Sequence, residues 1–398
     1  MGYNILVALR SIKKKDSSAF RTLLFTEYKN KYCLSQLSCA AYESPIFRSA
    51  IVVLLVIYSF RKIISVSLNQ KEDSNEIYIY NYENEKRSIL HNFSNAKNAN
   101  ELTYAYSFEN AIKNLKSLSL NFLDCFQIQK LIKLCLHLSK KNSFLVIARQ
   151  IEFLLLYIFF KNLFKEKTFK EVYISTESNP EVISAALACV GARINYTNHG
   201  FLNKDLGIFF HDRLFLDCRP LKNRIIPHLQ KPQAEIQIIK KTSKIFIQPK
   251  PSTKKILILC SLIVDINLLR KLIEEFRENL VDSEITVRFH PNKTFFNRKL
   301  VNFCKSLKIS VKWNESLKVQ LSESTLVIAG ETSAHLDALM QGVPSVYCKI
   351  DHFPKDHYGF ISSQLIPEMK SINDLENSVQ KFYSDPKWLK VYQDYFGE

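Results

Sequence analysis

The feature that most constrains the fold is a regular alternation of apolar runs and helix-type patterns between residues 255 and 348. The runs expected to be strands are 255–260, 284–289, 309–313, 325–329 and 344–348. The helices expected between them are 265–279, 294–307, 317–322 and 332–340. Strands that alternate with helices form a parallel sheet with helices on both faces. The C-terminal half is therefore predicted to be an α/β domain with a parallel sheet covered by helices.

A similar alternation begins at residue 171. Residues 171–175 (EVYIS), 193–197 and 213–218 are expected to be strands. A helix is expected over 181–190, because Ser178-Asn179-Pro180 supplies N-cap residues and a proline suited to a first helical turn. The first half of the chain therefore also predicts an α/β sheet.

A chain of 398 residues is long enough for about two domains. Residues 240–255 are basic and contain Pro249 and Pro251, so the boundary is placed there. We expect mainly helical structure over 1–75 and several helices over 101–166, with a strand over 76–82 between them. Residues 1–245 are expected to form an N-terminal domain with extra N-terminal helices, and residues 254–370 a C-terminal domain. Residues 371–398 are expected to form C-terminal helices that cross back towards the N-terminal domain.

The formal net charge is +17, and 46% of the residues are hydrophobic. This composition is typical of a folded globular protein and argues against disorder. The positive charge suits an acidic small molecule or an anionic membrane surface, although it is equally compatible with an ordinary solvated surface. The sequence has no zinc-finger spacing, RNP-like motif or long basic arm, so nucleic acid is not expected as a partner.

Nine cysteines are present, none in a C-x-x-C pair, and they are expected to be free thiols in a reducing compartment. The strongest apolar run, 50–60, would make about 16 Å of helix, too short for a ~30 Å hydrocarbon core. It is predicted to be a core helix or a segment inserted shallowly at a membrane surface. These features predict a cytoplasmic protein, with peripheral attachment to the inner face of the plasma membrane as a further possibility.

Polar clusters follow several expected strands. In the C-terminal half they are His290-Pro291-Asn292, Asn314-Glu315-Ser316 and Gly330-Glu331-Thr332-Ser333. In the N-terminal half they are Thr176-Glu177-Ser178 and Asn198-His199-Gly200. Ligands bind beyond the carboxyl ends of strands in open parallel sheets. Two sheets of this kind that face each other would enclose a central cleft.

The C-terminal clusters have residue types suited to a nucleotide. Gly330 permits a tight turn, and Thr332 with Ser333 begins a helix whose N–H groups suit a phosphate. His290 could donate to a phosphate oxygen, and Glu315 could accept hydrogen bonds from ribose hydroxyls. Each also has an ordinary structural interpretation, namely an N-cap, a structural histidine and a surface glutamate.

Taken together, His290-Pro291, Glu315 and Thr332-Ser333 resemble the nucleotide-binding motifs of bacterial GT-B sialyltransferases and related capsule and lipopolysaccharide transferases. The segment 334–345 (AHLDALMQGVPS) is also similar to many GT-B donor domains. The resemblance covers residues 255–350, is weaker over 170–220 and is absent over 1–100. It implies an α/β, GT-B-like fold of two Rossmann-like domains whose parallel sheets face a central cleft.

The resemblance also implies a function. It is inverting transfer of a nonulosonic acid (sialic, pseudaminic, legionaminic acid or Kdo) from a CMP-sugar donor to a glycan or lipid-linked glycan acceptor, in capsule or lipopolysaccharide synthesis. The donor contacts would be His290, Pro291, Asn292, Glu315, Gly330, Thr332 and Ser333. The acidic-acidic-Gly triplet that holds the general base in sialyltransferases is missing, so Glu177 and His199 are the candidate bases, with His290 as the catalytic group on the phosphate. No Asp-x-Asp motif is present, so neither a metal nor a separate cofactor is expected.

Three alternatives remain open. One is a CDP-polyol phosphotransferase of the teichoic-acid type, which uses similar His-Pro and Ser/Thr elements. Another is a GT-B transferase or epimerase that uses a UDP-sugar. The third is not an enzyme but a basic, membrane-associated binding protein.

Overall fold

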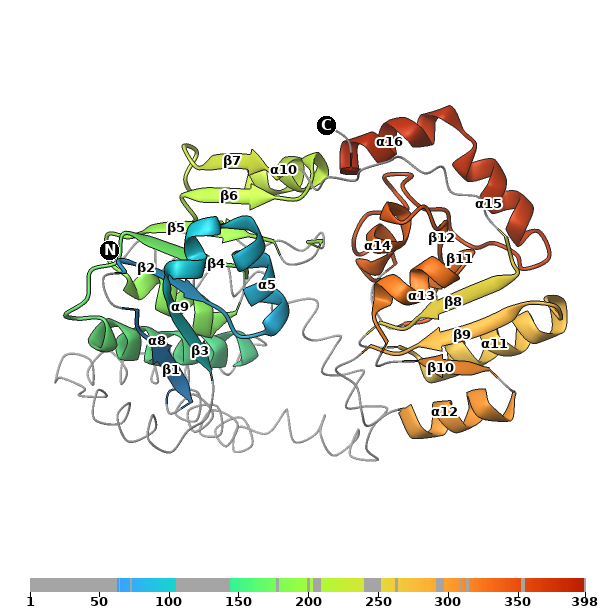
Figure 1. Ribbon diagram of the computed structural model, residues 1–398, viewed down its shortest axis with the longest axis horizontal. Coiled ribbons are helices and arrows are strands. Elements are labelled where there is room, and N and C mark those ends of the chain that lie inside the picture. The colour runs from blue at the N-terminus through green and yellow to red at the C-terminus, as the bar shows by residue number, and fades with distance from the viewer. Residues whose placement is uncertain are drawn as a thin grey trace. The chain divides into compact units, whose positions relative to one another are not determined.

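The chain divides into two compact units, drawn in Figure 1, which are described separately below. The computed structural model describes residues 63, 65–71, 74–104, 144–176, 179–198, 201–202, 209–239, 252–261, 264–290, 297–307, 309–312, 315–351 and 355–396. Unit 1 comprises residues 1–200 and 205–239, and unit 2 comprises 201–204 and 240–398. The change of unit after residue 239 lies at the start of the basic, proline-containing segment. Residues 371–396 belong to unit 2.

Unit 1 is built on a seven-stranded sheet. In sheet order the strands are β1 (Val66–Asn69), β3 (Asn100–Tyr104), β2 (Glu76–Ile79), β4 (Glu171–Ile174), β5 (Arg193–Thr197), β6 (Arg213–Leu216) and β7 (Glu235–Ile238). β1 pairs antiparallel with β3, and the other neighbouring pairs are parallel. The chain leaves β2 for β3 on one side and later returns to β4 on the other, so the topological switch point lies between β2 and β4.

The described helices of unit 1 are α5 (Glu83–Asn92), η1 (Ser94–Asn98), α8 (Phe144–Leu163), α9 (Pro180–Ala188), α10 (Arg219–Ile225) and η2 (Ile226–His228). Tyr78, Tyr80 and Tyr173 on one face of the sheet pack against Ile89 and Phe93 of the α5 region. Their strand neighbours on the opposite face are also buried, as expected for a parallel sheet covered on both sides. The cap of α9 is formed as predicted, because the Asn179 side chain accepts the Glu181 N–H at 3.1 Å.

Unit 2 is built on a five-stranded sheet in which every neighbouring pair is parallel. In sheet order its strands are β10 (Ser310–Lys312), β9 (Glu284–Arg288), β8 (Lys255–Leu259), β11 (Leu326–Ala329) and β12 (Ser345–Tyr347). β8, the first of these strands in the sequence, is central in the sheet. β9 and β10 extend the sheet on one side of it, and β11 and β12 extend it on the other. This 3-2-1-4-5 order is Rossmann-like, with its switch point between β8 and β11.

The helices of unit 2 are α11 (Ile266–Asn279), α12 (Asn297–Ser306), α13 (Leu317–Glu323), α14 (Ala334–Met340), α15 (Leu375–Tyr383) and α16 (Pro386–Phe396). Leu257 and Val327 pack on one face of the sheet against Leu321 of α13 and Ala338 of α14. α11 buries a stripe of four apolar side chains, at Leu269, Leu272, Ile273 and Phe276. The expected α/β class, with parallel sheets in two units, is thus confirmed, whereas the placing of the two sheets across a common cleft stays a prediction.

The C-terminal helices are attached to unit 2 through aromatic and polar contacts. Trp388 is 3% exposed, and its indole N–H donates to Leu365 O at 2.9 Å. The Tyr383 hydroxyl donates to Ser345 O at 2.6 Å and accepts the Ser345 N–H at 3.1 Å. The ring of Tyr395 stacks on Phe201, which also belongs to unit 2.

The prediction of helices over 101–166 is wrong at its start, because residues 101–104 lie in β3. Residues 66–69, which were expected to be in a mainly helical region, form β1. The two strands pair with each other in antiparallel register, for example Leu68 with Leu102. Short strands of this kind are stabilised by cross-strand pairing, which local propensity does not report. The N-terminal helices expected before residue 63 and the apolar run at 50–60 lie outside the described residues.

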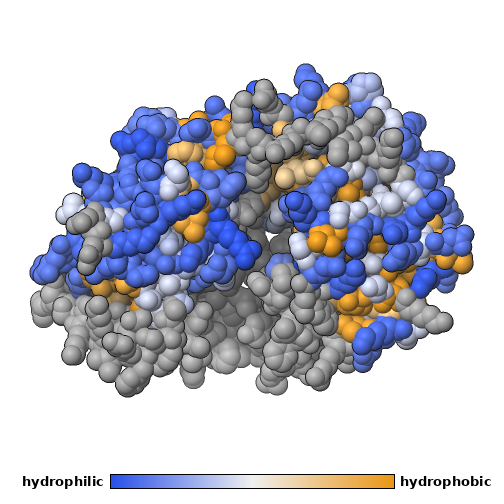
Figure 2. All heavy atoms as spheres, viewed as in Figure 1, coloured by the Kyte–Doolittle hydropathy of each residue, from blue (hydrophilic) through white to orange (hydrophobic). Residues whose placement is uncertain are grey.

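Hydrophilic residues cover most of the described surface on the face drawn in Figure 2, with apolar residues in small groups between them. Within the described parts of the chain, no helix combines the length and apolar character needed to cross a bilayer.

Candidate functional site

The switch point of unit 2 places two strand ends side by side. Cys260 and Ser261 follow β8, and Gly330 and Glu331 follow β11, which is its direct neighbour. All four residues are buried. This carboxyl edge is where a sheet of this topology binds ligands, and it is the candidate site.

Gly330 is required here by packing. A Cβ atom at this position would lie 2.1 Å from Asp351 Oδ2 and 2.9 Å from its Cγ. Asp351 is buried, and its Oδ2 accepts the Glu331 N–H at 2.7 Å. The absence of a side chain thus allows Asp351 to hold the turn that follows β11.

His335 ties this turn to the neighbouring strand. Its Nε2 lies 2.9 Å from Gly330 O, and its Nδ1 lies 2.7 Å from Ser345 Oγ. Because a carbonyl can only accept, Nε2 carries the proton and Nδ1 accepts the hydroxyl of Ser345. Burial lowers the pKa of His335 to about 4, so the ring is neutral at physiological pH and has a structural role.

This neutral histidine predicts a pH-dependent stability. The unfolded chain protonates His335 near its ordinary pKa of about 6.5, whereas the folded protein does so only near 4. The contribution of the neutral His335 to the free energy of unfolding is therefore fully present above about pH 6.5. It is lost as the pH falls towards 4, and the free energy of unfolding falls by up to about 3 kcal/mol. Urea unfolding of the wild type and of His335→Gln at pH 7.5 and 5 tests this. The difference in free energy of unfolding between the two proteins should change with pH. A difference that is the same at both pH values would contradict the neutral state of His335.

Thr332 and Ser333 stand at the start of α14, as predicted. The Thr332 hydroxyl accepts the Ala334 N–H at 3.3 Å, which is an ordinary capping contact. α14 has only seven residues, so its dipole is small. The two residues follow β11 at the carboxyl edge of the sheet, and their contact with a phosphate stays a prediction.

His290 is partly buried and follows β9 and the buried Phe289. β8 alone separates β9 from β11. Two strand spacings amount to about 10 Å, so the strands that precede His290 and Thr332 lie about that far apart in the sheet. The sheet therefore brings these two predicted residues to one edge, without direct contact between the strands that carry them.

Glu315 lies after the edge strand β10, further from the switch point. Its Oε2 pairs with Lys312 at 3.0 Å and accepts the Gln320 amide at 3.1 Å. These contacts lower the pKa of the Glu315 carboxyl below its usual value. Arg288 donates to Glu315 O at 2.7 Å and to Gln320 Oε1 at 2.8 Å, which links the end of β9 to Glu315 and to α13.

Four predicted site residues, Glu177, His199, Pro291 and Asn292, lie outside the described residues. Two described neighbours in unit 1 have clear structural contacts. Thr176 Oγ1 accepts the Asn179 N–H at 3.3 Å. The Asn198 amide donates to Asp217 Oδ2 at 2.8 Å and so links the ends of β5 and β6.

Sequence reasoning missed a buried polar group at the edge of unit 2. Ser261 Oγ, Glu331 Oε1 and Tyr347 Oη are buried and have no hydrogen-bond partner among the residues that the structure describes. They follow or end β8, β11 and β12, three adjacent strands. Unsatisfied buried polar atoms are uncommon and deserve a functional explanation. The signal available in the sequence was Glu331 itself, an acidic residue directly after an apolar strand.

No group of three or more metal-ligating side chains occurs among the described residues. Four of the five described cysteines are buried, as expected for thiols in an apolar core. Burial raises the pKa of Cys304 to about 11, so this thiol is unreactive at neutral pH.

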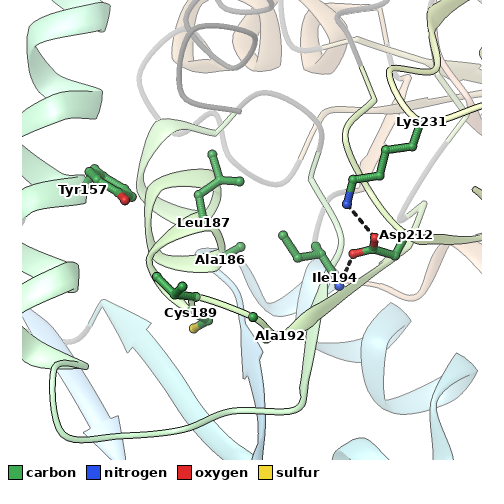
Figure 3. A pocket seen from close by; sticks show the side chains of 10 residues that line it. Tyr157, Ala186, Leu187, Cys189, Ala192, Ile194, Asp212 and Lys231 are labelled. Atoms are coloured by element: carbon green, nitrogen blue, oxygen red, sulfur yellow. Dashed lines mark hydrogen bonds and ion pairs between the residues drawn. The ribbon is translucent and has the colours of Figure 1, made fainter. Parts of the chain in front are cut away.

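A cavity of about 120 Å³ lies at the opposite, amino-terminal edge of the sheet in unit 1 (Figure 3). Its lining includes Tyr157 and Cys189, and most of its lining residues have uncharged side chains. Its charged residues are Asp212 and Lys231, which pair at 2.5 Å, while Asp212 also accepts the Ile194 N–H at 2.9 Å. The cavity lies away from the strand ends at which parallel sheets bind ligands, so we do not place the site there.

No protein-family model and no curated protein matches this sequence. Solved structures with a similar chain course include UDP-GlcNAc 2-epimerase from Neisseria meningitidis bound to UDP-GlcNAc (12% identity, 81% of this chain and 96% of that chain, TM-score 0.46). Others are the calicheamicin glycosyltransferase CalG4 (9%, 81% and 94%, TM-score 0.47) and a glycosyltransferase from Rickettsia africae (12%, 82% and 95%, TM-score 0.40). At these identities the residues of the site have to be argued from the structure itself.

Proposed function

We propose that the protein is a nucleotide-sugar-dependent glycosyltransferase that binds its donor at the carboxyl edge of unit 2. The observation that carries the proposal is the switch point between β8 and β11, where Gly330 and the hydroxyls of Thr332 and Ser333 lie two strands from His290. A ligand with a phosphate at its centre suits a hydroxyl-lined strand end with an imidazole opposite it.

The proposed chemistry assigns one task to each residue. His290 donates to the leaving phosphate, where negative charge develops as the glycosidic bond breaks. Glu315 accepts from the ribose through Oε1, since its Oε2 already carries the contacts to Lys312 and Gln320. Glu177 or His199 of unit 1 removes the proton from the acceptor hydroxyl of a glycan or lipid-linked glycan.

The identity of the donor is the finer part of the proposal. The motifs resemble those of transferases that use CMP-linked nonulosonic acids in capsule or lipopolysaccharide synthesis. A UDP-sugar transferase or epimerase is the second candidate, and it suits the site at least as well, because CMP and UDP share ribose and phosphate groups. The assigned residues address those shared groups, and none of them is assigned to the base.

A nucleotide panel tests the proposal. CMP, CDP, UDP and GDP should be added in turn, and the melting temperature of the full chain should be measured by calorimetry. A nucleotide that binds the folded state at 100 times its Kd stabilises it by about 2.7 kcal/mol, so one member should raise the melting temperature by several degrees. Product analysis with labelled CMP-sialic acid, CDP-glycerol and UDP-GlcNAc then separates the three donor classes. If no nucleotide shifts the transition, the enzyme assignment fails.

A further inference from the structure

Glu331 is contacted by the chain that follows β12. The Tyr358 N–H donates to Glu331 Oε2 at 3.4 Å. The backbone N–H groups of Tyr358, His357 and Asp356 all favour the charged form of the Glu331 carboxyl. Asp356 has a φ of 58°, in the left-handed region. Successive N–H groups in a turn with left-handed residues form a concave site for an anion.

The turn that forms this concave site is held by its own contacts. The Asp356 carboxylate accepts the Ile361 N–H at 2.8 Å and the Ser362 N–H at 3.2 Å. Further along, the Ser363 hydroxyl lies 3.1 Å from the Tyr395 hydroxyl of α16. The N–H groups of 356–358 are therefore positioned without help from Glu331.

Glu331 is poorly accommodated in this position. It is 4% exposed, and its Oε1 is buried with no hydrogen-bond partner in the described part of the chain. Asp351 adds a second buried carboxylate beside it, partly offset by Lys349 at 3.7 Å. Burial and Asp351 together raise the pKa of Glu331. The other titratable groups here are the Tyr347 phenol, Asp356 and His357.

We propose that the backbone N–H groups of residues 356–358 form an oxyanion site for the donor, and that Glu331 occupies this site when no donor is bound. The ligand group is a phosphate or a sugar carboxylate, since either can accept three N–H donors. When it binds, the Glu331 carboxylate leaves the N–H groups, remains next to Asp351, and takes up one proton from solution. The identity of the ligand rests on the proposed function, whereas the exchange at the N–H groups does not.

Calorimetric titration of the full chain at pH 8, in buffers with different ionisation enthalpies, measures this exchange. Inorganic pyrophosphate supplies phosphate alone, free N-acetylneuraminate supplies carboxylate alone, and CMP and UDP supply a nucleotide. We expect net proton uptake when the ligand binds, and the probe that shows it identifies the source. Glu331→Gln should abolish the uptake and tighten binding about tenfold, because a neutral amide competes more weakly for the N–H groups.

Glu284→Gln is the matched control, because it removes an exposed carboxylate at the amino end of β9, and it should bind as the wild type does. Binding to the wild type without proton uptake overturns the proposal, even if the Gln variant does not fold. Weaker or unchanged binding by a folded Glu331→Gln also overturns it and leaves Glu331 as a structural clamp. If pyrophosphate binds with proton uptake but neither nucleotide binds, the oxyanion site stands and the proposed function is refuted. Failure of all four probes to bind refutes both.

Discussion

Replacing Gly330 with alanine is expected to lower the free energy of unfolding by about 3–5 kcal/mol. The added Cβ would overlap Asp351, whose Oδ2 would be 2.1 Å away. Asp351 is buried between the turn after β11 and Lys349, so it cannot move without losing its bond to the Glu331 N–H. A buried N–H left without a partner adds about 1–3 kcal/mol to the cost of the overlap. Urea unfolding monitored by far-UV circular dichroism measures the loss.

Gly191→Ala is the control for Gly330→Ala. Gly191 has a φ of 83° and no heavy atom within 4 Å of an added Cβ. The change there therefore imposes backbone strain of about 1 kcal/mol without a steric overlap. If Gly330→Ala destabilises no more than Gly191→Ala, Asp351 does not pack against residue 330 as described, and the close contact cannot explain the glycine.

The helices and strands of the second half of the chain were predicted well because the signals that define each of them lie within its own residues. β8 is a continuous apolar run after its first residue, Lys255, and α11 is capped by Asp265, whose side chain accepts the N–H groups of Asn267 and Leu268. Alternation of such elements restricts the topology to a parallel sheet. The order of the strands in the sheet was not predicted from the sequence, and it is known only from the strand pairing in the structure.

The first half was predicted less well because several of its strands depend on distant partners. β7 has the sequence EIQI, with polar residues at alternate positions, and it is held by pairing with β6. Arg213 at the start of β6 also contacts Glu235 of β7 at 2.8 Å. Pairing across the sheet decides the structure of such short segments, and it is not visible in a local pattern.

The candidate site shows the same division. Gly330, Thr332 and Ser333 were found from their place after a strand, which is a local feature. Glu331 was recognised as polar, but its contacts come from Asp351 and Tyr358, which lie 20 and 27 residues further along the chain. Because the burial of Glu331 depends on residues distant in the sequence, the local sequence around Glu331 could not predict it.

His290→Ala is expected to reduce kcat about 10²–10³-fold with the donor that the nucleotide panel identifies, a loss of about 2.7–4 kcal/mol in transition-state stabilisation. The imidazole can contribute most when the leaving phosphate gains charge, so kcat should fall more than KM rises. Folding should be little affected, because His290 is only partly buried and lies beyond the last paired residue of β9. Steady-state kinetics and the melting temperature should be measured on the same preparation.

His91→Ala is the matched control, since this histidine is exposed in the last turn of α5 in unit 1, and its removal should leave kcat unchanged. His290→Gln adds a second comparison, because glutamine can still donate a hydrogen bond but carries no positive charge. Partial recovery by the glutamine variant would show that the bond to phosphate matters, whereas equal loss in both variants would assign the effect to charge. Activity within threefold of the wild type for His290→Ala would remove His290 from the mechanism, because an imidazole bound to the leaving phosphate cannot be dispensable.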